Sequence, residues 1–383
     1  MLKPKNLLAI SLPAGLALTE ISVFIPVFKE SEQLPSLLEK LVEQDASKEI
    51  IVTVDEPTQS FLEKMKTFKD VTLLVNEKRI GKANALNNSI RHSTGKVLVF
   101  LDSDVELDDD PAFLTKIIDK MANVDVLDIK KKVERTSFLA KMTYYEYFTF
   151  NISSWIASRY LQKCPATNGA AFAIKRDTFE DVGGFKKVVA EDIDIATRAF
   201  LKDHSFAYTS DVEVKNVVFS SWRRWFTQRE RWAVGQALWL KDHYKALFNK
   251  CIRKPQIFLP AVFFLYPPLI SFSINLLLPS TWMYDLMTLL SWFAATKLGT
   301  VLPIFLVSIP TIDVLKSTLV ALSSFVVTAG LFYRFSKKLG FEFRLHEVFI
   351  YYFFYSILWI SVIFVGYFEV LVLKRTSAPN WKT

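Results

Sequence analysis

The sequence predicts an α/β domain followed by a helical membrane region. Over roughly the first 220 residues, short runs of β-branched and aromatic residues alternate with helical patterns of leucine and valine. This alternation is typical of a sheet with helices packed on its faces. Beyond Gln256 the chain changes to long apolar runs with few charges, which indicate membrane helices. At 383 residues the chain is long enough for both regions.

The composition favours a membrane protein over a nucleic-acid-binding protein. Hydrophobic residues make up 51% of the chain, and phenylalanine occurs 33 times, which is high for a soluble protein. The net charge of +8 is not gathered into a basic stripe with interleaved aromatics, so we attribute it to an anionic bilayer surface and expect no nucleic acid partner. Cys164 and Cys251 lie far apart and indicate neither a disulfide framework nor a cysteine metal site.

The first predicted elements follow a βαβαβ order. The strands are short apolar runs, and the helices have apolar residues at helical spacing. In chain order we expect a strand over 21–28 that Pro26 closes, a helix over 34–42, a strand over 49–54 followed by Asp55 and Glu56, a helix containing Phe61, Met65 and Phe68, and a strand over 71–75. Strands joined by crossover helices pair in parallel, so this order predicts a parallel doubly wound sheet.

A glycine turn follows the third strand. Gly81 allows a tight backbone turn, and the Ala-Asn-Ala-Leu-Asn run after Lys82 predicts a helix. Lys82 would then lie at a helix N-terminus, where backbone N–H groups and the helix dipole favour anions. The alternative is an ordinary solvated lysine.

The next strand ends in two carboxylates. Val97–Leu101 is apolar throughout and predicts a strand buried on both faces, and Asp102 and Asp104 follow directly. Buried carboxylates are costly unless a cation neutralises them, and parallel sheets bind ligands at the carboxyl ends of their strands. Hard oxygen ligands suit Mg²⁺ or Mn²⁺ carrying a diphosphate. On these residues alone, a polar turn is an equal alternative.

The order of the motifs resembles the family 2 glycosyltransferases. The resemblance covers roughly Ile21 to Trp232, and Gln-x-x-Arg-Trp is the signature of the cellulose synthase and hyaluronan synthase branch. It implies a GT-A fold, a Rossmann-like domain that binds nucleotide sugars. The motifs are Gly81–Asn87, Asp102-Ser-Asp104, Thr167–Arg176 with Val182-Gly-Gly-Phe185, Ala190-Glu-Asp-Ile-Asp194 with Ala in place of the usual Thr, and Gln228-Arg-Glu-Arg-Trp232.

The resemblance also implies the donor-side roles. Asp104 is expected to bind the metal directly, and Asp102 either joins it or contacts the ribose. The second strand ends in Val-Asp-Glu-Pro rather than the usual Asp-Asp-Gly-Ser, so either Asp55 or Glu56 could face the base. The expected nucleotide-sugar-binding residues are Pro26, Glu30, Asp55, Glu56, Lys82, Asn84 and Asp102.

On the acceptor side, the resemblance makes Asp192 the general base, with Glu191 as its supporting neighbour. A base must lie within reach of the acceptor hydroxyl proton. No second carboxylate is placed as a covalent nucleophile, so we expect direct displacement with inversion. Asp194 is either an ion-pair partner or a solvated residue. The resemblance assigns Gln228, Arg231 and Trp232 to a leaving-group and acceptor clamp, and Asn168 and Gly169 to the acceptor-side segment, although Asn168 stands where Cys is common.

The C-terminal region is predicted to anchor the protein in the plasma membrane with the catalytic domain cytosolic. A helix over 142–156 is either interfacial or buried. With four spans the basic stretch 334–344 would face outward, against the positive-inside rule. The expected domains are 1–220 (GT-A), 221–255 (interfacial helix region with Gln-x-x-Arg-Trp), 256–373 (about four spans, near 257–278, 284–309, 313–333 and 346–372) and 374–383 (cytosolic tail).

Together these features predict an inverting, metal-dependent membrane glycosyltransferase. It would use a UDP- or GDP-sugar with Mg²⁺ or Mn²⁺ to extend a polysaccharide, and its own helices could export the product. The alternative is transfer of a single sugar to a membrane lipid, either a polyprenyl phosphate or a glycolipid. The Gln-x-x-Arg-Trp signature favours the polysaccharide, whereas a small number of helices favours the lipid.

Overall fold

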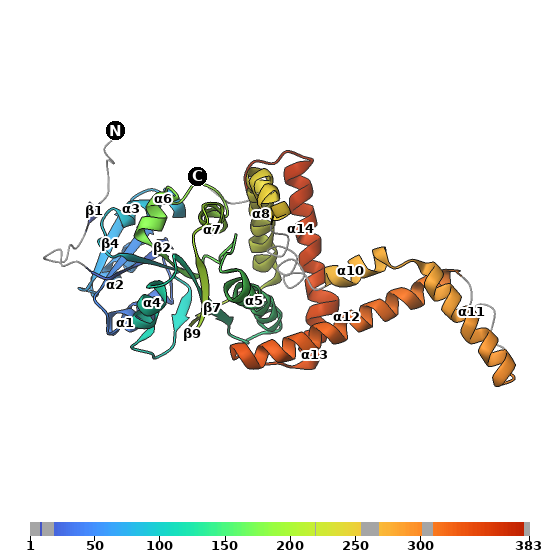
Figure 1. Ribbon diagram of the computed structural model, residues 1–383. Helices are drawn as coiled ribbons and strands as arrows, with labels where there is room; N and C mark the ends of the chain where they lie inside the picture. The colour runs from blue at the N-terminus through green and yellow to red at the C-terminus, as the bar shows by residue number, and fades with distance from the viewer. Residues whose placement is uncertain (1–7, 10–18, 219, 254–267, 301–308, 379–383) are drawn as a thin grey trace. The chain divides into compact units, whose positions relative to one another are not determined.

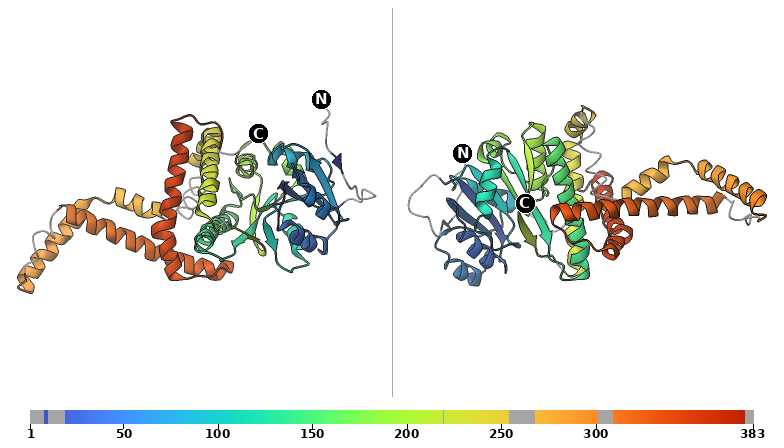
Figure 2. Two further views of the ribbon diagram at one scale, coloured as in Figure 1. Left: turned by 180° about the vertical axis from the view of Figure 1, so that it is seen from behind. Right: turned by 60° about the horizontal axis from the view of Figure 1, so that its bottom comes forward.

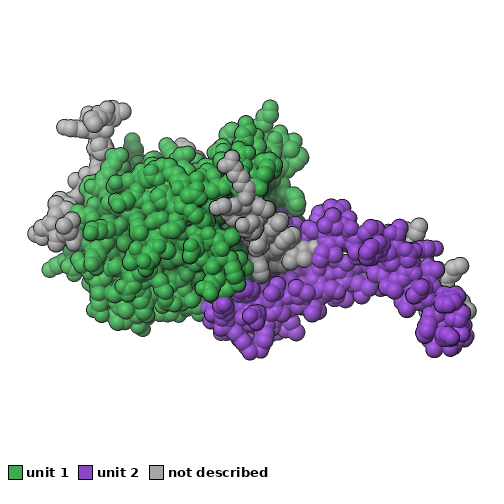
Figure 3. Space-filling view, in the orientation of Figure 1, with its two compact units in different colours: residues 1–261, 361–383 green, residues 262–360 purple. Residues whose placement is uncertain are grey.

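The computed structural model describes residues 8–9, 19–218, 220–253, 268–300 and 309–378. It divides into two compact units, shown in different colours in Figure 3. Unit 1 comprises residues 1–261 and 361–383, and unit 2 comprises residues 262–360.

Unit 1 is built on a mixed sheet, nine-stranded within the described residues, in the order β1-β4-β3-β2-β5-β8-β7-β9-β6 (Figure 1). The run β4-β3-β2-β5 is parallel, as the βαβαβ pattern predicts. The rest of the sheet is mixed and departs from a purely parallel prediction, because β8 is antiparallel to both β5 and β7, whereas β7 and β9 pair in parallel. The strands are β1 (Leu8–Ala9), β2 (Ile21–Phe28), β3 (Lys48–Asp55), β4 (Val71–Asn76), β5 (Val97–Leu101), β6 (Val105–Leu107), β7 (Val126–Val133), β8 (Ala171–Lys175) and β9 (Phe206–Asn216).

The antiparallel direction of β8 matters for the site. Leu101 at the end of β5 pairs with Ala171 at the start of β8. The Asp102 N–H donates to the carbonyl of Ala170 at 3.0 Å. The segment before β8, which contains Asn168 and Gly169, therefore lies at the sheet edge where β5 ends.

Pro26 does not close its strand. It pairs with Thr53 inside β2, which continues to Phe28 before Lys29 turns the chain with φ of 64°. The pairing of β2 with β5 stops at Phe24, so the missing N–H of Pro26 leaves no gap in that ladder.

Helices cover both faces of the sheet (Figure 1; two further views in Figure 2). One face packs its alternate strand residues against α1 (Leu34–Val42), α2 (Gln59–Met65) and α4 (Phe113–Met121). On the other face lie α3 (Lys82–Ile90), against β2 and β3, and α6 (Arg176–Asp181), against β8. The aromatic rings of Phe24, Phe100, Phe172, Phe179 and Phe185 pack together on this second face, in stacked and edge-to-face pairs.

Four further helical segments complete unit 1. They are α5 (Phe138–Ile156), which the π-helix η1 (Ala157–Leu161) continues, α7 (Glu191–Leu201), α8 (Trp222–Arg253) and the end of α14 (Ser356–Leu371). Most residues of α5 are buried, so the buried-helix alternative for residues 142–156 is the one that the structure supports. Asp194 on α7 is also buried and pairs with Arg198 at 2.6 Å and with His243 of α8 at 2.8 Å. It is an ion-pair partner and not a solvated residue.

Unit 2 is helical. Thr311–Leu339 and Leu345–Leu371 are long and apolar enough to cross a membrane, by length and composition, and they correspond to the third and fourth predicted spans. Much of the first predicted span, part of the second and the end of the tail (379–383) lie outside the described residues. The basic stretch that begins at Arg334 is not a loop throughout, because α12 extends to Leu339. Of the two candidate spans, Thr311–Leu339 lies in α12 (Ile309–Leu339), and Leu345–Leu371 comprises α13 (Leu345–Ile350), η4 (Tyr351–Tyr355) and α14. The described part of unit 2 also contains α10 (Pro268–Leu277) and α11 (Ser280–Lys297).

Gly95 offers a test of this packing at the turn before β5. A Cβ added there would lie 2.6 Å from the backbone nitrogen of Ser22, which β2 holds in place. We expect Gly95→Ala to cost about 1–3 kcal/mol of unfolding free energy, as overpacked positions do. Thermal unfolding of the full chain should show a melting temperature several degrees lower. Lys96→Ala, at the exposed neighbouring position, is the control. Equal melting temperatures for the two variants would contradict the packing described here.

Candidate active site

Asp55 fixes the loop that leads into α3. One carboxylate oxygen accepts hydrogen bonds from the backbone N–H groups of Ile80 and Gly81, both at 3.0 Å, and the other accepts one from the Asn76 amide at 2.9 Å. Gly81 has φ of 87°, a conformation that favours glycine. Asp55 is buried, whereas Glu56 is exposed and accepts a bond from the Arg79 N–H at 3.1 Å. Of the two acids, Asp55 is therefore the one that shapes the start of α3.

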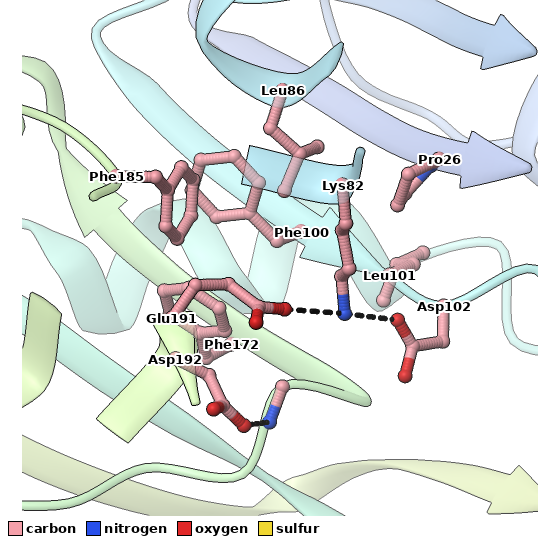
Figure 4. A pocket seen from close by; sticks show the side chains of 11 residues that line it. Pro26, Lys82, Leu86, Phe100, Leu101, Asp102, Phe172, Phe185, Glu191 and Asp192 are labelled. Carbon is pink, nitrogen blue, oxygen red and sulfur yellow. Dashed lines mark hydrogen bonds and ion pairs between the residues drawn. The ribbon is translucent and has the colours of Figure 1, made fainter. Parts of the chain in front are cut away.

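Lys82, the first residue of α3, joins two distant parts of the chain. Its ammonium lies 2.7 Å from an Asp102 oxygen and 3.3 Å from a Glu191 oxygen (Figure 4). Burial disfavours the charge on Lys82, but the carboxylates of Asp102, Glu191 and Asp192 outweigh it and raise the Lys82 pKa well above its usual range. Lys82 is therefore a permanent cation between the end of β5 and the start of α7.

Asp102 and Asp104 follow β5 with unequal exposure. Asp102 is half-buried, and Asp104 is accessible to solvent. Partial desolvation and the charge of Asp102 raise the Asp104 pKa to about 6, against the opposing charges of Lys82 and Arg231. The effect of Arg231 shows that α8 brings this side chain into the electrostatic range of Asp104.

The two carboxylates fit a hard divalent cation. No group of three or more His, Cys, Asp or Glu side chains is arranged to hold a metal within the described residues. Mg²⁺ is commonly held by one or two carboxylates, with phosphate oxygens and water completing its shell. Asp102 and Asp104 match that donor set, and the raised Asp104 pKa shows that a cation would relieve an unfavourable charge there.

Asp192 lies at the N-terminus of α7. Its carboxylate accepts hydrogen bonds from the Gly169 N–H at 2.6 Å and from the Ile193 N–H at 2.8 Å. A Cβ at residue 169 would come within 2.8 Å of the same carboxylate, so this approach requires glycine. Burial raises the Asp192 pKa despite the nearby Lys82 charge, and burial likewise raises that of Glu191. A carboxylate with a raised pKa suits a general base.

Lys82, Asp102, Glu191 and Asp192 line one small pocket together with phenylalanine rings (Figure 4). Phe100, Phe172 and Phe185 contribute these rings. The full lining is Pro26, Lys82, Leu86, Phe100, Leu101, Asp102, Gly169, Phe172, Phe185, Glu191 and Asp192. The structure thus brings together the strand-end carboxylate, the helix-start lysine and the predicted base from three separate sequence motifs.

Besides Asp55, Asp104, Gln228, Arg231 and Trp232, four further predicted residues lie outside this lining. Glu30 is exposed and accepts a hydrogen bond from Thr58 at 3.1 Å, and Glu56 is exposed as well. The Asn84 amide donates to the Ile80 carbonyl at 2.9 Å, and the Asn168 side chain accepts from the Ala170 N–H at 3.0 Å. Both asparagines thus make local backbone contacts, and the roles predicted for all four stay predictions.

The Gln-x-x-Arg-Trp segment lies in the second and third turns of α8. Arg231 is exposed, and Gln228 and Trp232 are half-buried. The sequence prediction overlooked Arg229, which is 1% exposed and pairs with Glu146 of α5 at 2.7 Å. The available signal was Glu146, a lone carboxylate in the aromatic stretch 142–156. A buried carboxylate of this kind needs a cationic partner.

The chain matches known proteins over most of this unit. Residues 22–182 match the family model described as Glycosyl transferase family 2. The chain is 26% identical over 260 residues to a poly-beta-1,6-N-acetyl-D-glucosamine synthase of Staphylococcus epidermidis, covering 65% of this chain and 62% of that protein. It is 27% identical over 184 residues to glucomannan 4-beta-mannosyltransferase 1 of Oryza sativa subsp. japonica, covering 44% of this chain and 34% of that protein. The chain therefore spans less than two thirds of the length of either relative.

A solved structure shares the fold. It is a mannosyltransferase from Pyrobaculum calidifontis in complex with GDP-Man and Mn²⁺, with a TM-score of 0.52, 18% identity, and coverage of 97% of this chain and 92% of that one. The family match contains Lys82, Asp102 and Asp104, whereas Glu191, Asp192 and α8 lie beyond it. Residues 22–182 thus match a family 2 glycosyltransferase domain, and the chain shares the α/β fold of this solved mannosyltransferase.

Proposed function

We propose that this protein is an inverting, metal-dependent membrane glycosyltransferase that extends a polysaccharide from a UDP- or GDP-sugar. The observation that carries the proposal is the bridge from Asp102 through Lys82 to Glu191, with Asp192 beside it in the same pocket. In this proposal, Lys82 and Asp102 would serve the diphosphate and Asp192 would serve as the base, on two sides of the space where one sugar carbon reacts.

On the donor side, Asp104 and Asp102 would hold Mg²⁺ or Mn²⁺, which supplies positive charge to the diphosphate leaving group. Lys82 adds a fixed positive charge at the start of α3, beside the same phosphates. Asp55 acts indirectly by fixing the loop before Lys82. Pro26 lines the pocket, and Glu30, Glu56 and Asn84 are proposed to contact the nucleotide around its rim.

On the acceptor side, Asp192 takes the proton of the acceptor hydroxyl as that oxygen attacks the sugar carbon. The bond from this carbon to the phosphate oxygen breaks, and its electron pair leaves with the nucleoside diphosphate. Among the pocket carboxylates Asp102 and Glu191 pair with Lys82, so neither is presented as a covalent nucleophile. Direct displacement inverts the configuration at that carbon. Asn168 and Gly169 border the acceptor, while Gln228, Arg231 and Trp232 close over it and the leaving group.

A polysaccharide is the acceptor that we favour. The two relatives are named as a polysaccharide synthase and a glucomannan mannosyltransferase, which supports a polymer product. The alternative is one sugar transferred to a polyprenyl phosphate or a glycolipid. This alternative is favoured by the small number of candidate spans, since only two helices in the described part of the chain meet the criteria for a membrane span. Two helices are too few to enclose a channel for a polymer. Those helices support membrane attachment, and we place the catalytic domain on the cytosolic side of the plasma membrane.

The decisive experiment offers the purified full chain a panel of radiolabelled nucleotide sugars with Mn²⁺, in lipid, and sizes the products. A ladder of water-soluble polymer supports elongation. A single organic-soluble band would replace elongation by lipid glycosylation. Absence of transfer from every donor would overturn the proposed activity altogether.

Asp192→Asn tests the base. The amide keeps the shape of the side chain but cannot accept the acceptor proton, so transfer should fall by about 10²–10⁴-fold. Nucleotide binding, measured by calorimetry, should stay near the wild-type value because Lys82, Asp102 and Asp104 are intact. Glu180→Gln, an exposed change outside the pocket, is the control. Near-normal turnover of Asp192→Asn would remove Asp192 as the base.

Metal binding should depend on pH through Asp104. Its pKa of about 6 is raised above that of an ordinary carboxyl, so in the folded protein Asp104 is protonated at lower pH and carries an unfavourable charge at higher pH. A proton must leave before a metal binds, so Mn²⁺ should raise the melting temperature more at about pH 7.5 than at about pH 5. Asp104→Asn should abolish this difference. An equal Mn²⁺ effect at both pH values in the wild-type protein would show that Asp104 does not control metal binding.

A further inference from the structure

Arg229 occupies the first of the two unspecified positions in Gln-x-x-Arg-Trp, yet it is among the most buried side chains in the described residues. One terminal nitrogen lies 2.7 Å from a Glu146 oxygen, and these two side chains are 1% and 2% exposed. Glu146 belongs to α5, 83 residues earlier in the chain. The pair therefore fastens the start of α8 to the buried helix α5.

The same guanidinium touches both ends of the motif. Its other terminal nitrogen donates to the Gln228 side-chain oxygen at 3.0 Å. The guanidinium carbon lies 4.1 Å from the ring centre of Trp232 and 5.5 Å from that of Trp225, one turn earlier. Both distances are within the range of cation–π attraction. Arg229 thus contacts Gln228 and Trp232 while Glu146 holds it in place.

Arg231 has a different task, although it is only two residues away. Positions two apart on a helix are separated by roughly 200°, so they point to opposite sides. Arg231 is exposed, and its charge acts on Asp104. Arg231 therefore interacts with Asp104, whereas Arg229 supports Trp232 from its buried side.

We propose that Arg229 is a positioning residue that orients Gln228 and Trp232 toward the acceptor sugar, with Glu146 as its anchor. The inference rests on the proposed transferase function for its kinetic consequence. Trp232 is half-buried, so part of its flat apolar ring is left for a sugar. Arg229 fixes the rotamer of Trp232, because the indole ring packs on the Arg229 guanidinium. This guanidinium cannot move without breaking its ion pair with Glu146. Small misplacements of such a group cost about 10²-fold in rate.

Single substitutions do not separate this role from simple stability. Removing one member of a buried ion pair leaves an uncompensated charge and destabilises the fold, whatever else the pair does. Replacing both members with apolar residues of similar size is often neutral. The decisive variant is therefore the double change Glu146→Leu with Arg229→Met. Arg229→Lys is the second variant, since it keeps the charge but loses the planar fork that reaches two partners at once.

Two measurements follow on the full chain. The first is transfer to oligosaccharides of the poly-N-acetylglucosamine and glucomannan classes. The double variant should regain the wild-type melting temperature but transfer at least about 10-fold more slowly, with an unchanged KM for the nucleotide sugar. The second is ¹⁹F NMR of protein labelled with 5-fluorotryptophan, in which Trp232→Phe assigns the Trp232 signal. That signal should shift or broaden in the double variant and in Arg229→Lys.

Glu230→Gln is the matched control, because Glu230 is the other unspecified residue of the motif and its partner is Arg375 at 3.2 Å. It should leave the Trp232 signal in place. The inference would be overturned if the double variant had the wild-type melting temperature, the wild-type transfer rate and an unshifted Trp232 signal. The Arg229–Glu146 ion pair would then contribute only to stability. If the wild-type chain transfers no sugar, the proposed function fails, and the Trp232 signal alone still decides the positioning role. An unmoved signal in a folded Arg229→Lys variant overturns that role even if the double variant does not fold.

Discussion

The ammonium group of Lys82 sets the arrangement of the whole site. Asp102, Glu191 and Asp192 arrive from β5 and α7, and their mutual repulsion would separate these elements if no cation stood between them. Lys82 can stand there only because the backbone of Gly81 adopts a positive φ and the loop before it is bound by Asp55. One ion-pair centre thus depends on a glycine turn, a buried acid and an antiparallel strand that brings Gly169 to the same edge. Substitutions at any of these positions would act on Asp192 as well as on Lys82 and Asp102.

The sequence allowed the central half of the sheet and most of the pocket to be predicted. The strands β2 to β5 and the helices between them follow local patterns, and Lys82, Asp102 and Asp192 lie in motifs that resemble those of the family 2 glycosyltransferases. The direction of β8 could not be predicted, because it depends on which strand Ala171–Lys175 meets after a long excursion through α5. The ion pair of Arg229 with Glu146 could not be predicted either, since no local sequence pattern links residues that far apart. The sequence does not decide whether Asp55 or Glu56 points into the site, because both are acids at the end of the same strand. Only the fold shows that Asp55 is the buried one.

The polar pairs of α7 and α8 also show how a buried charge can specify geometry. Asp194 binds Arg198 and His243, while Trp239 of α8 donates to Thr197 at 2.9 Å. Buried ion pairs contribute little net stability compared with apolar packing, but they require fixed partners in fixed directions. Here the Asp194–Arg198 pair lies within α7, while the contacts of Asp194 with His243 and of Thr197 with Trp239 join α7 to α8. Because Glu191 and Asp192 form the first turn of α7, the angle at which the candidate base enters the pocket depends on these contacts.

Helix α8 carries this constraint further, to the end of the helix 345–371. A Cβ on Gly235 of α8 would lie 3.0 Å from Val189, just before Glu191 and Asp192. Two residues earlier, Ala233 meets Gly366 of α14 so closely that a Cβ on Gly366 would lie 2.7 Å from it. Arg375 adds ion pairs to Glu230 at 3.2 Å and to Glu369 at 2.5 Å. Contacts this tight leave no free volume, so a shift of residues 361–371 along their axis must move α8, and α8 must in turn move the segment that carries the base. The position of the candidate base is therefore mechanically tied to the end of a helix that is long and apolar enough to cross a membrane.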